Sequence, residues 1–484
     1  MAVATRKPGV EGKVVEELRS GRIKPFKAGE RAEELRKADK PDENVGTAIR
    51  RQWREEIDGV SFEHVGHYSI DMNEVANDGL TIGAVQIPVK FVGEIAIDGQ
   101  HAKGTYPVYV AALEGKLAAG MYRGIETFNL FNEAKGIRTA VEKDGMTRDV
   151  LVQFDDVQNA AVFTNWVNSP EGQTFMCEKF NSMTEHGKLI EAQAFMDTTA
   201  VHIRFAAATG AAMGMNMVTD YGREVMDAAI SHVTKPEGIL QGIHIDVLTP
   251  SGNLCTDKKD AHINMLLGRG LTVHATARLP VELVKERFFK NVDCTPLEAA
   301  KRLVRVNREK NERGTRLAGS YSANTHAANA LAALYIAYGQ DPAQVVEGSL
   351  ATIYMELTDD DKYVLVRGRF PALELGTFMG ETKWGAQREL LKASGFYGDG
   401  DETGKTRLAF GEFVAAVTMV ADANLTAVQA AGEYGRQRPI DGKKQNELGR
   451  SREKKKADGG QAGGADADPP KKPTALSATA PAPA

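Results

Sequence analysis

Apolar and polar positions along the first 58 residues follow a helical spacing. The runs KVVEELRSG and RAEELRKAD place apolar residues three and four positions apart, and a Gly or an Asp ends each run. Charged residues fill most of the remaining positions. The pattern predicts a strongly charged, helical N-terminal region over residues 1–58.

The pattern changes near Val60 to short β-branched runs that are interrupted by Gly, Pro and an Asp-Gly pair. The stretch GLTIGAVQIPVKFVGEIAIDGQHAKGTYPVYVAALEG is typical of strands joined by hairpins. A helix-like stretch, RGIETFNLFNEAKG, follows it.

Residues 150 to 250 combine strands with one long helix. The strand DVLVQF opens this part, and in AVHIRFAAA the residues Val201, Ile203 and Phe205 alternate with polar neighbours. One helical face is formed at intervals of three and four by Val218, Tyr221, Val225, Ala229 and Val233. A mixture of this kind over about 100 residues has the size of a domain.

Residues 262–440 return to a helix-rich pattern, which includes the alanine-dense stretch HAANALAALYIAYG. Alanine at this density is typical of closely packed, buried helices. From residue 441 onward the sequence is polar, rich in Pro, Ala and Gly, and without periodicity. We therefore predict a disordered tail over 441–484.

Composition and charge argue against several classes of protein. At 484 residues the chain is long enough for two or three domains. A formal net charge of −5 gives no argument for a nucleic-acid partner or for an anionic membrane surface. The N-terminus has no signal-peptide core, and no run approaches the roughly 18 apolar residues of a membrane span, so we expect no membrane insertion.

The three cysteines, Cys177, Cys255 and Cys294, lie far apart and form no CxxC or Cys/His spacing. This pattern argues against a disulfide framework and a structural zinc site, and it suits a reducing compartment. The stretch GDGDETGKT has neither phosphate-loop nor calcium-loop spacing, and no GxGxxG follows a strand. We therefore predict a cytoplasmic protein with no metal site.

Three stretches carry motifs that point to one kind of chemistry. Residues 249–264 read TPSGNLCTDKKDAHIN, residues 326–344 read HAANALAALYIAYGQDPAQ, and residues 209–217 read TGAAMGMNM. They resemble the motifs SGNxCTDKKPAAIN, HAANxxxAxYIAxGQDxAQ and TGDAMGMNM of the hydroxymethylglutaryl-CoA reductases, and further matches stand in family order over roughly 60–440. On these motifs the chain is identified as a member of that family.

The resemblance implies an α+β fold with two interleaved domains. A large, helix-rich, mixed α/β substrate domain over 59–149 and 249–440 would be interrupted by a small ferredoxin-like NADP-binding domain over 150–248. The implied reaction is the NADPH-dependent reduction of 3-hydroxy-3-methylglutaryl-CoA to mevalonate. The acyl-CoA substrate would bind at a subunit interface of a homodimer or homotetramer.

The resemblance also implies the site residues. Lys258 would be the cation beside the carbonyl oxygen as that oxygen becomes an oxyanion, and Glu114 and Asp341 would hold its charge and pass protons. The residues implied to bind substrate are Arg123, Arg148, Ser251, Asn253, Asp257, Lys259, His326 and Asn329. The residues implied to bind NADPH are Met213, Gly214, Met215, Asn216, Met217, Gly376, Thr377 and Gly380.

The chain departs from the family pattern at both ends of this site. Glu433 stands where the family has the histidine that protonates the departing CoA thiolate, so it becomes the candidate acid. Ala211, Met379 and Glu381 replace an acid and two glycines of the cofactor motifs. Because a carboxylate repels a pyrophosphate and a Met side chain adds bulk, we expect weakened or lost NADPH binding.

These departures leave three interpretations open. The chain is a working reductase with Glu433 as substitute acid; or it is a diverged enzyme that acts on a related acyl-CoA or an aldehyde; or it is a non-catalytic acyl-CoA-binding subunit. Fold and site resemblance alone do not decide the reaction. The joint presence of Glu114, Lys258 and Asp341 favours an enzyme.

Overall fold

The computed structural model describes residues 9–37, 42–58, 61–62, 66–68, 70–75, 79–131, 136–401 and 403–432. The tail predicted over 441–484 lies outside the described residues. Three separate hydrophobic cores organise the part of the chain that is described.

The first core belongs to a group of short helices. Apolar residues at helical spacing, among them Val14, Leu18 and Ile49, pack together and leave the charged faces outside. The elements are α1 (Val10–Arg19), η1 (Pro25–Lys27), α2 (Ala28–Arg36), α3 (Glu43–Asp58) and, after them, α4 (Met72–Val75). The prediction of a helical N-terminal region is confirmed.

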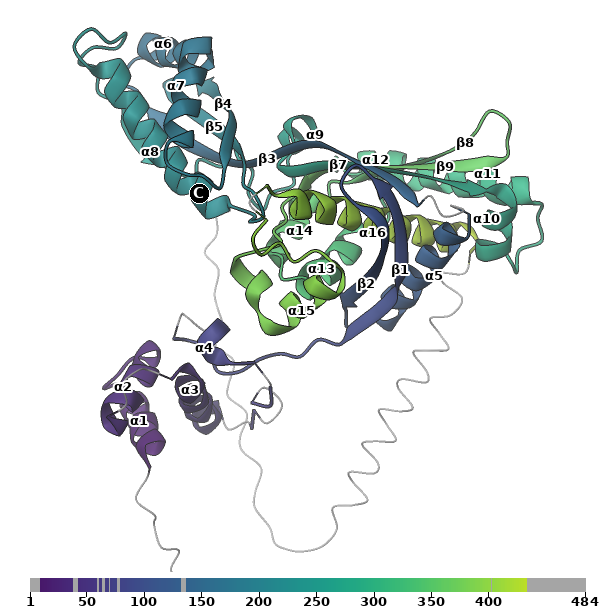
Figure 1. Cartoon of the computed structure of the whole chain (residues 1–484), viewed down its shortest axis with the longest axis horizontal. Coiled ribbons are helices and arrows are strands. Elements are labelled where there is room, and N and C mark those ends of the chain that lie inside the picture. The colour runs from purple at the N-terminus through teal and green to yellow at the C-terminus, as the bar shows by residue number, and fades with distance from the viewer. Residues whose placement is uncertain are drawn as a thin grey trace, which may run out of the picture. The chain divides into compact units, whose positions relative to one another are not determined.

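The largest core is built on a mixed sheet with the strand order β2-β1-β3-β7-β9-β8 (Figure 1). Strands β1 and β3 pair in parallel, and the other neighbours are antiparallel. The strands are β1 (Val89–Gly99), β2 (Lys103–Ala111), β3 (Ile137–Gln153), β7 (Gly270–Pro280), β8 (Thr352–Leu357) and β9 (Tyr363–Leu373).

Three of these strands, β7, β8 and β9, lie in the region that the pattern predicts to be helix-rich. In the structure, burial alternates along β7. Val273, Ala275, Ala277 and Leu279 are buried, while Arg278 is exposed. Period-two alternation of this kind is the signature of a strand with one buried face. The sequence pattern did not reveal this strand, because small residues such as Ala275 and Ala277 favour helices.

Helices pack against the sheet of the large core and against one another. They are α5 (Gly115–Phe131), α9 (His262–Leu267), α10 (Val281–Phe288), α11 (Pro296–Val306), η2 (Asn307–Gly314), α12 (Thr315–Leu317), α13 (Ala327–Ala337), η3 (Pro342–Gln344), α14 (Val345–Gly348), η4 (Gly380–Lys383), α15 (Gly385–Ala393) and α16 (Lys405–Ala430). The alanine-dense stretch forms α13, and it is buried as expected.

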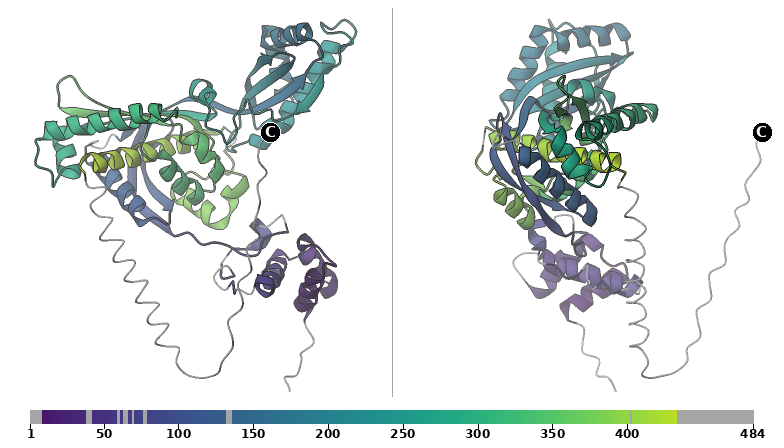
Figure 2. Two further views of the ribbon diagram at one scale, coloured as in Figure 1. Left: turned by 180° about the vertical axis from the view of Figure 1, so that it is seen from behind. Right: turned by 90° about the vertical axis from the view of Figure 1, so that its right-hand side faces the viewer.

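Helix α16, drawn in yellow-green, runs through the large core (Figure 2). It packs against helices α5 and α13 and against strands β7 and β9. By length and composition it could cross a membrane, but 83% of its most apolar window is buried inside the protein. Such burial is that of a core helix.

Glu412 connects α16 to the turn between β1 and β2. Its buried carboxylate accepts the backbone N–H groups of Gln100 (3.0 Å), His101 (2.9 Å) and Ala102 (2.7 Å). Hydrogen bonds to an ionised acceptor are stronger than neutral ones, so this residue fixes the hairpin on the helix.

The third core belongs to a smaller unit in which β3 also takes part. The C-terminal half of β3 pairs with β5 and β6, and β5 pairs with β4. The other elements are α6 (Val157–Asn168), α7 (Pro170–Asn181), β4 (Lys188–Asp197), β5 (Ala200–Ala208), α8 (Met215–Thr234) and β6 (Asp246–Thr249). With α6 and α7 in the first helical position, the order βαββαβ and the pairing β4-β5-β3-β6 are ferredoxin-like.

Local signals explain where the helices of the small unit begin. The side chain of Asp156 accepts the N–H groups of Gln158 and Asn159 at the start of α6, and Ser169 caps α7, which has Pro170 in its first turn. Phenylalanine side chains then fill the core between helices and sheet. The predicted α+β fold class with a small ferredoxin-like unit inside a larger one is confirmed, whereas the exact domain boundaries stay a prediction.

Candidate active site

The loop that joins β6 to α9 carries Lys258 and has a strained backbone. Asn253, Thr256 and Lys258 have φ angles of 72°, 58° and 57°, in the left-handed region that residues with a Cβ rarely adopt. The N–H of Leu254 donates to Oδ2 of Asp149 on β3 at 2.8 Å. Neighbouring elements therefore impose the conformation of the loop.

Lys258 meets Asp341 at the end of this loop. Its Nζ lies 2.8 Å from Oδ2 of Asp341, and the two side chains are 41% and 24% exposed. Asp341 also caps η3, because Oδ1 accepts the N–H of Ala343 at 2.9 Å. The hydrogen bond to Asp341 raises the pKa of Lys258, although partial burial opposes the rise. The site thus presents an oriented ammonium that is open to a substrate.

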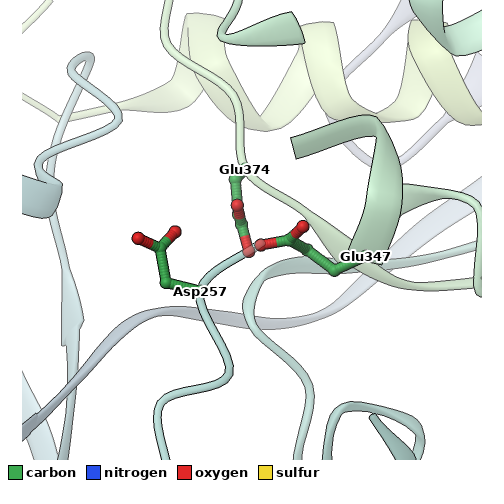
Figure 3. Close-up of side chains that lie close together, drawn as sticks. All are labelled: Asp257, Glu347 and Glu374. Atoms are coloured by element: carbon green, nitrogen blue, oxygen red, sulfur yellow. The ribbon is translucent and has the colours of Figure 1, made fainter. Parts of the chain in front are cut away.

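A buried group of charged residues adjoins the loop (Figure 3). Asp257, Glu347 and Glu374 bring carboxylate oxygens within 4.8 Å of one another. The guanidinium of Arg269 pairs with all three: Nη2 is 2.9 Å from Asp257, Nε is 3.6 Å from Glu347, and Nε also pairs with Glu374. Such spacing could hold a metal ion, but Arg269 already provides the positive charge, so we interpret the group as an ionic network.

Burial shifts the acid–base behaviour of this network. Desolvation raises the pKa of Glu347, and it raises the pKa of Glu374 well above its ordinary value although Arg269 opposes the change. Desolvation likewise raises the pKa of Asp149, despite a 2.8 Å contact between its Oδ2 and Nδ1 of His202. Burial therefore makes these carboxyl groups easier to protonate than exposed ones.

Several residues predicted to bind substrate lie on or against the lysine loop. Arg148 on β3 is buried, with Nη1 at 3.3 Å from Asp257 and Nε at 2.7 Å from Oγ1 of Thr219. Nζ of Lys259 donates to the carbonyl oxygen of Asp257 at 2.9 Å. The loop members Ser251, Asn253 and Lys259 are exposed. Cationic and polar groups thus gather on and against the lysine loop, and their part in substrate binding stays a prediction.

Other predicted site residues are not brought to Lys258 within one chain. Glu114 precedes α5, is exposed, and makes no hydrogen bond or ion pair with Lys258 in the described part of the chain. Nε of Arg123 donates to Asn424 of α16 at 2.9 Å. Nε2 of His326 faces the carbonyl oxygen of Ala421 at 3.0 Å.

Asn329 stands on the first turn of α13 and is exposed. Its backbone N–H donates to the carbonyl oxygen of His326 at 2.9 Å, so the two residues form one local turn. Glu433, the predicted acid, lies outside the described residues.

The predicted cofactor stretches lie against each other. The N–H of Thr377 donates to the carbonyl oxygen of Ala211 at 2.8 Å, and a Cβ on Gly376 would stand 2.9 Å from the backbone nitrogen of Met213. The Gln340 amide holds both backbone groups of Gly376, at 2.8 and 2.9 Å. The residue before Asp341 therefore ties this strip to the lysine–aspartate pair.

Helix α8 begins inside this arrangement and leaves free N–H groups. Gly214 is its N-cap with φ 76°, and a Cβ there would stand 2.4 Å from the side chain of Thr209. Among the described residues no side chain caps the helix, so the N–H groups of Met215, Asn216 and Met217 remain available. A helix N-terminus of this kind attracts phosphate groups, which fits a dinucleotide.

Two family departures have visible structural consequences. Ala211 is 8% exposed, and a Cβ added to Gly398 would lie 3.3 Å from the Cβ of Ala211. The lack of a Cβ on Gly398 therefore leaves the space beside Ala211 free. Met379 has φ 72° and ψ 169°, a region that is open in practice only to glycine, and its side chain is exposed.

The Met379 backbone leads to a prediction about stability. The substitution Met379→Gly should raise the free energy of unfolding by about 1 kcal/mol, because it relieves a strain of ~1–3 kcal/mol against the greater unfolded-state freedom of glycine. Urea unfolding measures the change. Met379→Ala is the matched control, since it removes the exposed side chain but keeps the Cβ. Equal stability of the two variants would contradict the prediction.

The sequence reasoning did not single out Glu347, Glu374 or Arg269 as members of the site. Each is a charged residue inside an otherwise apolar run, as in VVEGSL, PALELG and LLGRGLTV. Charged residues are seldom fully buried unless they are paired, so this placement was an available signal.

Comparisons with known proteins identify a family. A model of the hydroxymethylglutaryl-coenzyme A reductase family matches residues 46–437. The 3-hydroxy-3-methylglutaryl-coenzyme A reductase of Pyrococcus abyssi is 36% identical over 429 residues, which are 87% of this chain and 97% of that protein. The enzyme of the same name from Methanocaldococcus jannaschii is 32% identical over 426 residues, with shares of 87% and 97%.

A solved structure supports the fold. The class II 3-hydroxy-3-methylglutaryl-CoA reductase from Streptococcus pneumoniae, bound to NADPH in open conformations, has a TM-score of 0.54 and 14% sequence identity to this chain. The match covers 86% of this chain and 96% of that one. At this identity the likeness concerns the fold.

Proposed function

Because the chain belongs to the hydroxymethylglutaryl-coenzyme A reductase family, we propose that it reduces 3-hydroxy-3-methylglutaryl-CoA to mevalonate with NADPH. The observation that carries the proposal is the 2.8 Å contact between Lys258 of the family's lysine motif and Asp341 of its GQD motif. An oriented cation of this kind is what a carbonyl reduction needs, since the carbonyl oxygen gains negative charge.

Lys258 and Asp341 divide the work at the carbonyl group. The ammonium of Lys258 stabilises the developing oxyanion, and its raised pKa keeps it charged at neutral pH. Asp341 orients the ammonium and accepts or returns a proton through it. Because the thioester is reduced first to an aldehyde and then to an alcohol, the same pair acts twice.

The free carboxylate of the substrate requires a cationic pocket. Arg148 and Lys259 supply the charge, and Ser251 and Asn253 supply exposed polar groups on the same loop. Asp257 orients Arg148 at 3.3 Å. We assign Arg123, His326 and Asn329 to the outer part of the acyl-CoA site, since they lie on α5 and at the start of α13.

NADPH, when bound, supplies a hydride for each of the two reductions. The residues that fit it are those of the strip around Gly376, Thr377 and Gly380 and the turn from Met213 to Met217. The uncapped start of α8 supports this assignment, because it offers N–H groups to a phosphate, and the glycines at 214 and 376 let the two stretches pack closely against their neighbours.

Glu114 acts, in our proposal, on the Lys258 of a second copy of the chain. It is exposed in its own chain and stands next to Leu113, which is 80% exposed. Val89 (49% exposed) and Phe91 (55%) lie on β1, where Val89 pairs with Ala111 near the end of β2, and Val85 before β1 is 83% exposed. An exposed apolar group of this kind is typical of a protein interface, which supports a homodimer or homotetramer.

Glu433 is the proposed acid for the CoA thiolate, and it gives a prediction. The reduction of mevaldehyde releases no thiolate, so it should be faster than reduction of the thioester. A carboxyl group protonates a thiolate at neutral pH only if its pKa is raised by about two units, whereas a histidine does so near its ordinary pKa. Glu433→His should therefore accelerate the thioester reaction and leave mevaldehyde reduction unchanged.

The measurement is the loss of NADPH absorbance with each substrate across pH 5 to 8, for the unaltered protein and the variant. Glu433→Ala serves as the control that removes the acid altogether. If Glu433→Ala changes neither rate, position 433 is not the proton donor. If purified protein forms no mevalonate from either substrate, the proposed reaction itself is wrong.

The reducing compartment expected from the cysteines supports a cytoplasmic location. All three cysteines are free in the structure, and Cys255 is buried in the lysine loop. A thiol at that position suits a compartment in which disulfides do not form.

A further inference from the structure

The peptide that carries Lys258 is held by a buried carboxyl group. The backbone N–H of Lys258 donates to Oε1 of Glu347 at 2.6 Å, and the Glu347 side chain is completely buried. This contact fixes the plane of the peptide between Asp257 and Lys258. From a fixed plane, the φ of 57° decides where the Lys258 side chain points. A φ in the ordinary negative range would turn that side chain by more than a right angle.

The charges around Glu347 do not balance if every group is ionised. The network holds three carboxyl groups, Asp257, Glu347 and Glu374, against two guanidinium groups, Arg148 and Arg269. Lys258 is already paired with Asp341. One proton within the network would make it neutral, and a neutral network avoids the cost of an unpaired buried charge. Tyr335 and Cys255 also face it, and the charge of Arg204, which faces Arg269, is offset by Asp149.

The buried carboxyl oxygens of Glu347 and Glu374 indicate where that proton lies. Oε2 of Glu347 and both oxygens of Glu374 are buried and accept no well-formed hydrogen bond among the described residues, although Oε1 of Glu374 forms the ion pair with Nε of Arg269. The carboxylate oxygens of the two glutamates lie within 4.8 Å of each other, and the two side chains point toward one another (Figure 3). A proton on one of them would donate to the other and satisfy both. Two carboxyl groups at such a distance do not readily ionise together.

We propose that Glu347 and Glu374 share one proton and that Glu347 is a positioning residue for the reaction, because its carboxylate holds the Lys258 peptide and so directs the ammonium to Asp341. This inference rests on the proposed reductase function. It adds a requirement to that function: the orientation of Lys258 depends on a buried acceptor that itself touches neither substrate nor cofactor.

A shared proton makes a glutamine an almost equivalent partner. In Glu347→Gln the amide oxygen still accepts the N–H of Lys258, and the amide N–H replaces the shared proton toward Glu374. The pair then keeps its single negative charge. Glu374→Gln is the matched variant. It also leaves a single negative charge on the pair, and that charge then lies on Glu347. Glu347→Ala removes the acceptor and leaves the Lys258 peptide unsupported.

The first measurement is steady-state kinetics with 3-hydroxy-3-methylglutaryl-CoA and NADPH. Glu347→Ala should lower kcat by about 100-fold, the scale of losing one oriented electrostatic group, with little change in KM. Glu347→Gln and Glu374→Gln should keep kcat within about threefold of the unaltered protein. The proposal is overturned if Glu347→Gln loses as much kcat as Glu347→Ala, or if Glu347→Ala loses none.

The second measurement does not need catalysis, so it separates this inference from the proposed function. Acetylation of lysines by acetic anhydride, followed by mass spectrometry, reports the reactivity of Lys258, with exposed Lys259 as the internal reference. Glu347→Ala should release Lys258 from Asp341 and raise its relative acetylation by about tenfold, the factor of one pKa unit. Glu347→Gln should leave it unchanged.

The combinations of the two results are decisive. If no protein form reduces the thioester but acetylation follows the expected order, the reductase function fails and the positioning role of Glu347 holds. If the unaltered protein is active but Lys258 acetylation is the same in Glu347→Ala, the positioning role fails. Should Glu347→Ala unfold, Glu347→Gln still tests the role, since a loss of kcat or a rise in acetylation in that variant overturns it.

Discussion

Lys258→Ala is expected to lower kcat for both 3-hydroxy-3-methylglutaryl-CoA and mevaldehyde by about 10³-fold, which corresponds to ~4 kcal/mol of transition-state stabilisation. The ammonium lies 2.8 Å from Asp341, whereas Asp257 of its loop is committed to the ionic network and Lys259 is held, among the described residues, only by a backbone oxygen. Nothing else on the described part of the loop can replace it beside the carbonyl oxygen. Because the side chain is 41% exposed, the melting temperature should change little.

Lys259→Ala is the matched control for this loss. Lys259 is the next residue, it is exposed, and it contacts only the backbone oxygen of Asp257 in the described structure. Its removal should raise KM for the acyl-CoA and leave kcat nearly intact, as expected for a group that grips the substrate. Unchanged kcat in folded Lys258→Ala would mean that the chain does not reduce carbonyl groups at this site.

Mixed oligomers extend the same experiment to Glu114. If Glu114 serves the Lys258 of a second copy, then combining Lys258→Ala chains with Glu114→Ala chains should restore part of the activity that each lacks alone. An isologous dimer forms one complete site in such a mixed pair. No recovery after verified mixing would place Glu114 outside the reaction.

Glu412→Ala is expected to have the largest effect on stability, a loss of about 3–6 kcal/mol in the free energy of unfolding. Three buried or partly buried backbone N–H groups lose their acceptor, and each unsatisfied donor costs ~1–3 kcal/mol. The carboxylate is completely buried in the middle of α16, so water would enter only at the expense of core packing. Urea unfolding monitored by circular dichroism measures the change.

Thr418→Val is the matched control on the same helix. Thr418 is completely buried, and its hydroxyl has no hydrogen-bond partner in the part of the chain that the structure describes. Replacing an unsatisfied hydroxyl by a methyl group of similar shape should leave stability unchanged or raise it slightly. Glu412→Ala with a stability close to that of Thr418→Val would show that the hairpin does not depend on the carboxylate.

Motifs predicted the centre of the site better than they predicted its support. The lysine and GQD motifs led directly to Lys258 and Asp341, which lie 83 positions apart (341 − 258) and meet at 2.8 Å. Glu347 and Glu374 were not predicted, because no local pattern says which buried acid will face which backbone N–H. Such contacts depend on how distant elements pack.

The fold was predicted in part for a similar reason. Helices with a regular apolar face, such as α8, and the hairpin of β1 and β2 follow from local periodicity. Strand β7 was missed because its small residues resemble those of a helix, and only its pairing with β3 and β9 makes it a strand. Tertiary context overrides propensity at such positions.

Strand β3 belongs to both the large core and the small one, and this has a consequence for folding order. The small core draws on a continuous part of the sequence between Met146 and Ile245, whereas the large core needs β1 and β3 to meet β7 across that whole insertion. Closing a long loop costs conformational entropy before its contacts form, but the cost grows slowly with loop length. Once the residues between Met146 and Ile245 have packed on the C-terminal half of β3, the loop that must close between β3 and β7 is effectively shorter. The small unit then serves as a template that brings the two halves of the large core together.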